Sequence, residues 1–394
     1  MFRSILAELS ALQGRPIIIM AVFSMILSHG SLLKAQFQKP KPSIPNQTKL
    51  PPFEVSPTSA TTKSTATQNL NEPVDNAVVD PQIIVEPGEM LGQEPLMDSG
   101  VWDTPRGLRT DCCKGCPTFW YTSAEALWVD RNGADNTALS PFLNVGDFDY
   151  EAGWRITIGR QLDCLDATEM VYTGIDSWQS NSQAFSGMGL LQSFFAIGAL
   201  PDFDFANLQT SQYTSRFHSL EWNRRQWGWD IVSSLTGWRL LYLSEDLNFT
   251  SIDATPTVGS YQIKTENYMM GYQVGGDLFY PLGAKSTLAA KMKLGGYLNY
   301  AEGSTVVQDS GAVFANNSDE ELNISALVEL GVYYTHRITP RLTLKAGYEF
   351  WYLWRAALAP DQYVGAAVPG LGNRLISDSD TFYNGFNFGG EYQW

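Results

Sequence analysis

Apolar and polar residues alternate with a period of two along the end of the chain, in residues 381–394 (TFYNGFNFGGEYQW). Successive side chains of a β-strand point to opposite faces, so one parity forms one face. The other parity of this segment holds polar residues and glycine. The segment therefore predicts a strand with one aromatic face and one polar face. Its aromatic parity carries Phe382, Phe386, Phe388, Tyr392 and Trp394.

Four further segments, 264–281, 286–301, 321–336 and 340–354, show the same alternation. A water-soluble β-sandwich also alternates, but its outer face is richly charged and its inner face is an aliphatic core. Here the polar parity is small and sparsely charged, while aromatic residues gather near the ends of the apolar parity. This composition favours an apolar face toward lipid and a polar face toward an interior. The segments also exceed the roughly 9–11 residues that a tilted strand needs to cross a bilayer.

The whole pattern predicts ten strands, and the connections between them alternate between long and short. Outer-membrane barrels have an even strand number, short periplasmic turns and longer external loops. We therefore expect an all-β fold, a membrane-spanning antiparallel up-and-down barrel of about ten strands within residues 111–394. The expected long loops are 131–149, 179–213, 244–263, 302–320 and 355–380. The expected strands are 118–130, 150–161, 167–178, 214–224, 229–243, 264–281, 286–301, 321–336, 340–354 and 381–394.

The first 110 residues have a different composition. Arg3 and Arg15 precede the apolar run PIIIMAVFSMIL, which predicts a secretory signal peptide over 1–35, cleaved after Gly30 or Ala35. The alternative, a single membrane helix, needs about 17–25 apolar residues. Residues 36–110 are rich in Pro, Thr and Ser and predict a disordered periplasmic tether, because they bury too little apolar surface to fold.

The charge balance excludes one class of partner. The formal net charge is -15, whereas phosphate binding needs clustered Lys and Arg, so we expect no nucleic-acid partner. The 3 histidines argue against a multi-histidine metal site, and we expect no metal and no cofactor. The long loops are acidic, a pattern that attraction of cations and simple loop solubility explain equally well.

Several stretches resemble the family called putative beta-barrel porin seven, and the resemblance covers residues 117–394. It rests on TFWYTSAEALWVD, GWRITIGR, SLEWNRRQWGWDIVSSLTGWRLLYLSE and YNGFNFGGEYQW. It implies an exported integral outer-membrane barrel in contact with outer-membrane lipid, and it supplies no catalytic residues. The terminal Trp394, on the same parity as Phe386, Phe388 and Tyr392, is similar to the C-terminal signature that the barrel-insertion machinery recognises.

Charged residues on the odd parity are expected inside the barrel. Opposite charges on neighbouring strands would pair there, because an unpaired buried charge is costly. An eight-stranded barrel is filled by its side chains and a wide channel needs 16–18 strands, so about ten strands predict a plugged or very narrow lumen. We expect a structural, surface or narrow-pore role; a small-solute or ion channel is an alternative. The expected lumen charges are Glu221, Arg239, Asp277, Lys291, Lys293, Glu329, Lys345, Glu349 and Glu391.

A hydrolase at the outer rim is a further alternative, because such chemistry needs a histidine base near an acid or a nucleophilic serine. His218 lies near Ser215, Ser219 and Glu221 in sequence, with Asp176 near the end of the preceding strand. The parity of His218 is opposite to that of the two serines, and His336 lies by a short turn. We therefore expect no enzyme. The loops 179–213 and 355–380 are the expected binding surfaces, with no ligand named by the sequence.

The four cysteines are Cys112, Cys113, Cys116 and Cys164. Such a cluster is able to bind zinc, but an even number in an exported chain favours disulfides. The start of the first strand and the first short turn are expected on the same side of the barrel. We predict a bridge from Cys164 to one of the other three, plus one local pair.

Overall fold

The computed structural model describes residues 118–132, 137–229, 231–253, 257–368 and 370–394. The expected signal peptide 1–35, the expected tether 36–110 and the three clustered cysteines lie outside the described residues.

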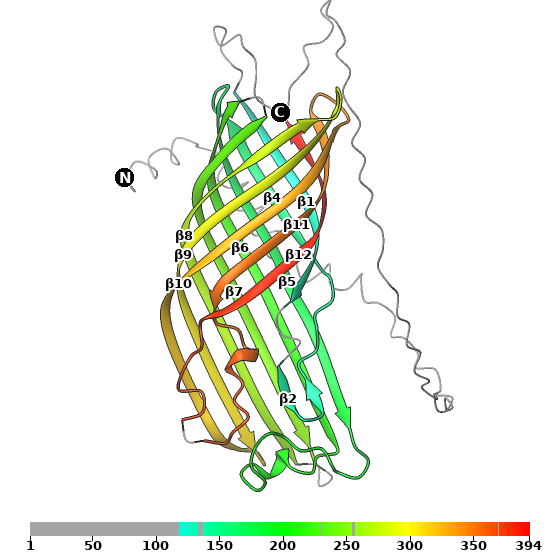
Figure 1. Ribbon diagram of the computed structural model, residues 1–394, viewed down its shortest axis with the longest axis vertical. Coiled ribbons are helices and arrows are strands. Elements are labelled where there is room, and N and C mark those ends of the chain that lie inside the picture. The colour runs from blue at the N-terminus through cyan, green and yellow to red at the C-terminus, as the bar shows by residue number, and fades with distance from the viewer. Residues whose placement is uncertain (1–117, 133–136, 230, 254–256, 369) are drawn as a thin grey trace, which may run out of the picture. The chain divides into compact units, whose positions relative to one another are not determined.

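Ten antiparallel strands form a closed barrel, as the sequence predicted, in the order β1-β12-β11-β10-β9-β8-β7-β6-β5-β4 (Figure 1). Pairing of β1 with both β12 and β4 closes the sheet, so that Tyr121 lies between Gln393 and Gly159. The strands are β1 (Phe119–Asn132), β4 (Glu151–Gln161), β5 (Asp166–Phe185), β6 (Leu208–Trp229), β7 (Val232–Ile252), β8 (Val258–Pro281), β9 (Ser286–Asp309), β10 (Ala312–Arg337), β11 (Leu342–Ala356) and β12 (Ser379–Gln393).

The two ends of the barrel differ. At the end where β12 finishes, here called the turn end, the connections 162–165, 230–231, 282–285 and 338–341 are all short. At the opposite end, the loop end, three long loops remain. The first contains the hairpin of β2 (Ala138–Ser140) and β3 (Leu143–Asn144), the second contains the 3-10 helix η1 (Pro201–Phe203), and the third contains η2 (Pro360–Gln362). Among the described residues, no helix has the length and apolar character needed to cross a membrane.

Two of the expected long loops were wrong. Residues 244–263 and 302–320 belong mostly to strands, because β7 continues to Ile252, β8 begins at Val258, and β9 and β10 extend to a turn at Ser310 and Gly311. These two residues have positive φ angles of 52° and 75°, which suit a tight hairpin turn. The strands β5 to β10 consequently reach 20 to 26 residues, well beyond what a membrane crossing requires.

The polarity of the strands reverses along their length, which explains the error. In β7, Leu240 and Tyr242 point outward, but farther toward the loop end Leu247 and Phe249 are buried inside while Asp246 is on the outer parity. The acidic residues on the outer face led us to predict a loop here. The same sheet therefore has an apolar outer face in one half and an apolar inner face in the other.

Three successive rows of outward side chains cross β7, β8, β9 and β10. Paired neighbours form an apolar row, Leu240, Met270, Leu298 and Ile324. Next come Tyr242, Tyr268, Tyr300 and Leu322, and then Ser244, Glu266, Glu302 and Glu320. The hydroxyls of Tyr242 and Tyr268 each donate to Glu266 at 3.0 Å. The outer surface thus passes from apolar to acidic within four residues of strand.

Candidate functional site

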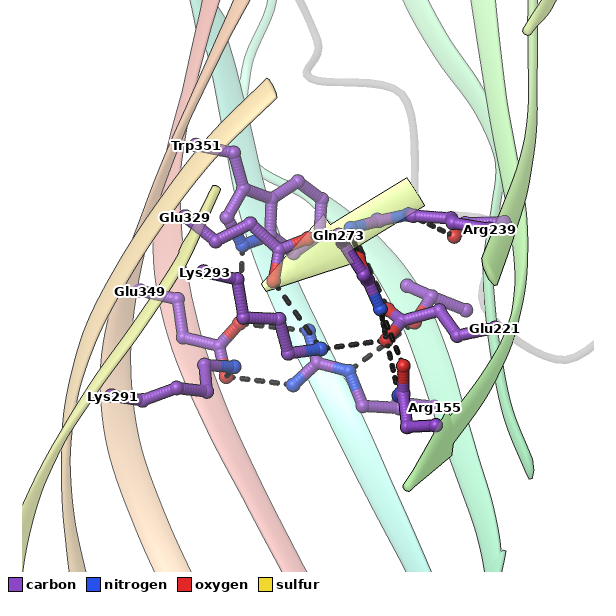
Figure 2. A network of polar contacts seen from close by, with 12 residues as sticks. Arg155, Glu221, Arg239, Gln273, Lys291, Lys293, Glu329, Glu349 and Trp351 are labelled. Carbon is purple, nitrogen blue, oxygen red and sulfur yellow. Dashed lines mark hydrogen bonds and ion pairs between the residues drawn. The ribbon is translucent and has the colours of Figure 1, made fainter. Parts of the chain in front are cut away.

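The barrel interior contains a layer of paired charges between the turn end and the middle of the strands (Figure 2). Among the described residues, the ion pairs of this layer join six cationic and six anionic side chains. The cations are Arg155, Arg225, Arg239, Lys291, Lys293 and Lys345. The anions are Glu125, Glu169, Glu221, Asp277, Glu329 and Glu349.

Glu349 on β11 is the acceptor at the centre of one group. Arg155 reaches across the lumen and donates two parallel hydrogen bonds to its carboxylate, at 2.6 and 2.7 Å. Lys291 donates at 3.1 Å, Asn387 at 2.6 Å and the indole of Trp351 at 3.1 Å. This bidentate arginine geometry is the strong form of a charge-assisted hydrogen bond.

A second group surrounds Glu221 on β6. Lys293 donates to it at 2.7 Å and the Gln273 amide at 2.7 Å, while Arg239 lies 3.5 Å away. Arg239 also pairs with Glu329. Figure 2 shows these side chains converging from strands on opposite walls. Each carboxylate therefore has a cation on either side.

The group nearest the turn end is built on Arg225, which pairs with Asp277 and lies 2.8 Å from Glu169. The Tyr121 hydroxyl donates to Glu169 at 2.5 Å. The Tyr121 ring lies over Gly159, where an added Cβ atom would come within 2.1 Å of the ring. Glycine at this strand position is what lets the tyrosine reach its acceptor.

Glu125 on β1 extends the group around Glu349. Arg155 lies 3.3 Å from it and Lys345 donates to it at 3.0 Å. The Lys345 ammonium also lies 4.4 Å from the centre of the Tyr333 ring, a cation–π distance. Each charge of the layer thus has an oppositely charged neighbour, which offsets the cost of burying it.

An apolar layer lies above the charges, toward the loop end. Phe217 stacks on Trp351 with ring centres 5.4 Å apart, and Tyr383 lies 5.9 Å from Trp351. The gap that Trp351, Tyr383 and Leu127 line has about 190 Å³ of empty space, but no part of it is wide enough for a water molecule. Water therefore has no room in this gap.

The barrel mouth is filled by residues 356–359, here called the strap, which are almost fully buried. Asn267 holds the strap through both its amide atoms, which bond the Ala357 nitrogen and oxygen at 2.8 Å. The Ala359 nitrogen donates to Glu245 at 2.8 Å, and Glu245 pairs with Arg131. Side chains of the wall therefore satisfy the backbone of a buried loop.

The loop containing η1 is fixed to the neighbouring strand tips by Asp202. The backbone nitrogen of Asp202 donates to Asp309 at 2.9 Å, and the Ser310 hydroxyl donates to Asp202 at 2.8 Å. Burial alone would raise the pKa of Asp202, but hydrogen bonds from Thr257 and Ser310 outweigh it and lower that pKa. Burial, together with the nearby charges of Asp202 and Asp204, raises the pKa of Asp309.

Eight of the nine lumen charges expected from the sequence belong to the charged layer. Glu391 does not join the ion pairs described above; it lies half-buried at the turn end and accepts a hydrogen bond from Gln393 at 3.1 Å. Sequence reasoning missed Glu125, Arg155 and Glu169 as lumen residues, although they share the odd parity, and assigned Arg225 to a turn. It also assigned Glu245 to a loop, whereas Glu245 is buried on β7.

The residues considered for hydrolysis are separated by the barrel wall. Ser215 and Ser219 are buried inside, while His218 is on the outer parity, with its Nδ1 atom 3.0 Å from the Tyr172 hydroxyl. At the turn end, the Nδ1 atom of His336 is 2.9 Å from the Ser286 hydroxyl.

The remaining expected residues lie at the turn end of the barrel. Phe386, Phe388, Tyr392 and Trp394 are exposed on the outer face. Cys164 lies in the turn between β4 and β5. Its bridge stays a prediction, because the other cysteines lie outside the described residues.

No family model and no curated protein matches the chain. Solved structures that it matches include the outer membrane protease OmpT from Escherichia coli, at 10% identity and a TM-score of 0.43, covering 71% of this chain and 98% of that one. Another is the translocator domain of the autotransporter NalP from Neisseria meningitidis, at 10% identity and 0.36, covering 70% and 88%. A major outer membrane protein from Thermus thermophilus matches at 10% and 0.29, covering 71% and 100%. The likeness is weak at these values, and the barrel assignment rests on the strand pairing.

Proposed function

We propose that the chain is an integral outer-membrane β-barrel with a closed lumen, which serves a structural and surface-exposed role rather than transport. The observation that carries this proposal is the interior itself, where paired charges and an apolar layer occupy successive levels of the same barrel. We also propose that the chain is related to the putative beta-barrel porin seven family, which it resembles, and that a secretory signal directs its export.

The outer surface supports a membrane location. Leu240, Met270, Leu298 and Ile324 are 50 to 61% exposed, a contiguous apolar surface that is unfavourable in water. The row of tyrosines beyond it matches the aromatic belt at a membrane interface, and the acidic row beyond that matches the aqueous side. Short turns face the periplasm in such barrels, so the loop end is assigned to the cell exterior.

The strands continue beyond the acidic row. From Glu266 to the start of β8 at Val258, and from Glu302 to the end of β9 at Asp309, the sheet extends by about eight residues, or roughly 25 Å of strand. The inner face of this extension packs the loops of the loop end. We propose that this projecting part is the functional surface of the protein.

The closed lumen is tested by the conductance of the purified full chain in planar lipid bilayers. We expect no stable conductance above that of the bare bilayer. A large, steady and non-selective conductance would overturn the proposal. A porin with an open lumen, reconstituted in the same way, should conduct, which shows that the assay detects an open barrel.

The proposed role is not enzymatic. The support is the outward position of His218 beside Tyr172 and away from the buried serines. Hydrolysis of a peptide or lipid by the pure protein, lost in His218→Ala with the barrel still folded, would contradict this. We further propose that outer-membrane lipid and the barrel-insertion machinery are its partners during assembly, the latter through the exposed aromatic residues of β12.

A further inference from the structure

The loop between β5 and β6 is an ordered hairpin at the outermost part of the barrel, the green segment at the lower end in Figure 1. Its two arms are joined by backbone hydrogen bonds between Ser186 and Asn207 at 2.8 Å, and between Leu191 and Ala206 at 3.2 and 2.8 Å. Asn207 also donates to Ile252 on β7 at 2.8 Å. The hairpin is therefore fixed to the neighbouring strand rather than free.

One side of this hairpin packs into the protein. Leu191, Phe195, Leu200 and Phe203 are buried, and the Phe195 ring centre lies 5.2 Å from that of Phe203 and 6.1 Å from that of Tyr261 on β8. Burial of these side chains explains why the loop is apolar in sequence. It does not explain the apolar residues that remain outside.

A second set of apolar side chains on and beside the same hairpin is exposed, and we name this set the apolar tip. The neighbouring strand tips also expose Val258, Val313 and Phe314, but the hairpin has the largest group of exposed aromatic, Leu, Ile and Met side chains, a composition typical of the centre of a protein interface. The apolar tip consists of Phe185, Met188, Leu190, Phe194, Ile197 and Phe205, which are 46 to 83% exposed.

The backbone at Phe205 is an independent sign of a constraint on this surface. Its φ angle is 55°, a left-handed conformation that a bulky residue adopts only at a steric cost. Hydrogen bonds of the flanking Ala206 and Asn207 hold the chain in place around it. The fold thus accepts local strain at a position whose side chain is half exposed, and strained residues of this kind cluster at functional sites.

The charged residues of the hairpin and of the strand tips beside it are all acidic, whereas loop 355–380, whose Gly365 lies against Phe194, contributes the exposed cation Arg374. The segments 179–213, 244–263 and 302–320 contain no Lys, Arg or His, while their partly or fully exposed acids include Asp246, Glu302 and Glu320. A second copy of this tip, or a membrane with anionic head groups, would be repelled by these carboxylates. A partner with basic side chains around an apolar centre would be attracted.

We propose that the apolar tip is a docking surface for a protein that presents an apolar patch edged by Lys and Arg side chains. The inference rests on the proposed function for the side of the membrane that the tip faces. It goes beyond it by assigning the surface and the chemistry of its partner.

The test uses the full-length protein in detergent micelles and a fluorescent amphipathic helical peptide made of Leu and Lys as the probe. We expect the peptide to bind, and binding to weaken by about tenfold or more in the variant Phe194→Ser with Ile197→Ser, since apolar and aromatic anchors dominate such contacts. A second variant, Met188→Ser with Leu190→Ser, should behave alike. All four side chains are exposed, and none of the changes alters the net charge.

Val368→Ser is the matched control, because Val368 is an exposed apolar residue of another loop at the same end. It should bind like the original protein. Equal binding by all variants would overturn the proposal, as would equal binding of a Leu and Glu peptide. A third result would also overturn the proposal. In that result the Leu and Lys peptide does not bind, and the apolar tip is instead required for binding to phosphatidylcholine vesicles or for self-association.

The two proposals fail separately. A conducting barrel whose tip binds the peptide would refute the closed lumen alone. A closed barrel that does not bind the peptide would refute the docking surface alone.

Discussion

Removing the Glu349 side chain is the sharpest test of the paired interior. In Glu349→Ala, five hydrogen bonds from Arg155, Lys291, Asn387 and Trp351 are lost at once. At about 1.5–3 kcal/mol for each bond to a charged group, a simple sum gives roughly 7–15 kcal/mol. That sum is too large, because Arg155 still lies 3.3 Å from Glu125 and 3.2 Å from the Thr173 hydroxyl.

The loss of folding free energy that we expect comes mainly from Lys291. Its ion pair among the described residues is with Glu349, so the variant leaves a buried ammonium without its carboxylate. Breaking a buried pair in this way costs about 3–5 kcal/mol, and we expect the free energy of unfolding to fall by about 4 kcal/mol. Replacing both Glu349 and Lys291 by Met should recover most of the lost folding free energy, because the apolar pair leaves no unpaired ammonium in the interior.

The assay is urea unfolding of the refolded protein in detergent micelles or lipid bilayers, followed by tryptophan fluorescence. Glu320→Ala is the matched control, since Glu320 is exposed on the outer face and its removal should cost less than about 1 kcal/mol. A loss for Glu349→Ala no larger than that of the control would refute the reasoning that paired charges support the interior.

Three further predictions concern other parts of the molecule. Phe217→Ala should lower the free energy of unfolding by about 3–5 kcal/mol through the cavity it leaves, against less than about 1 kcal/mol for the exposed Phe314→Ala in the same urea titration. Because the pKa of Asp202 is lowered in the folded state, its contribution is present above its ordinary pKa of 3.8 and is lost as the pH falls below that value. Amide exchange of the β5–β6 loop, corrected for intrinsic rates, should therefore accelerate below about pH 4 in the original protein and much less in Asp202→Asn. Peptide mapping without reduction should find Cys164 linked to Cys112, Cys113 or Cys116, and a free Cys164 thiol would exclude that bridge.

The strand number and the closure of the barrel were predictable because they depend on local alternation. A period of two is visible in any segment where one face meets lipid and the other does not, and the segment 381–394 shows it, with Phe382, Phe386, Phe388, Tyr392 and Trp394 on one parity. The strand lengths were not predictable in the same way. Beyond Ser244 the apolar parity of β7 changes from the outer to the inner face, so that a strand in water looked like an acidic loop.

The lumen charges were predictable as a set but not as pairs. Parity indicates that Glu349 and Arg155 point inward, yet they are 194 residues apart and meet only because closure of the barrel leaves just β1 and β12 between β4 and β11. The strap was not predictable at all. Its contact with Asn267 depends on a loop that folds back into the barrel, and no periodic pattern in the sequence indicates the path of that loop.

The reversal of polarity along β7 to β10 also fixes how deep the barrel sits. If the barrel slid toward the periplasm by two residues of strand, Glu266, Glu302 and Glu320 would replace the tyrosines at the interface, and each carboxylate would lose its water. Sliding the other way would expose Leu298 and Met270 to water. In the proposed location, the outward residues of these four strands therefore mark one edge of the bilayer, and lipid of another thickness would have to adapt to that edge, since rigid paired strands leave the lipid as the softer partner.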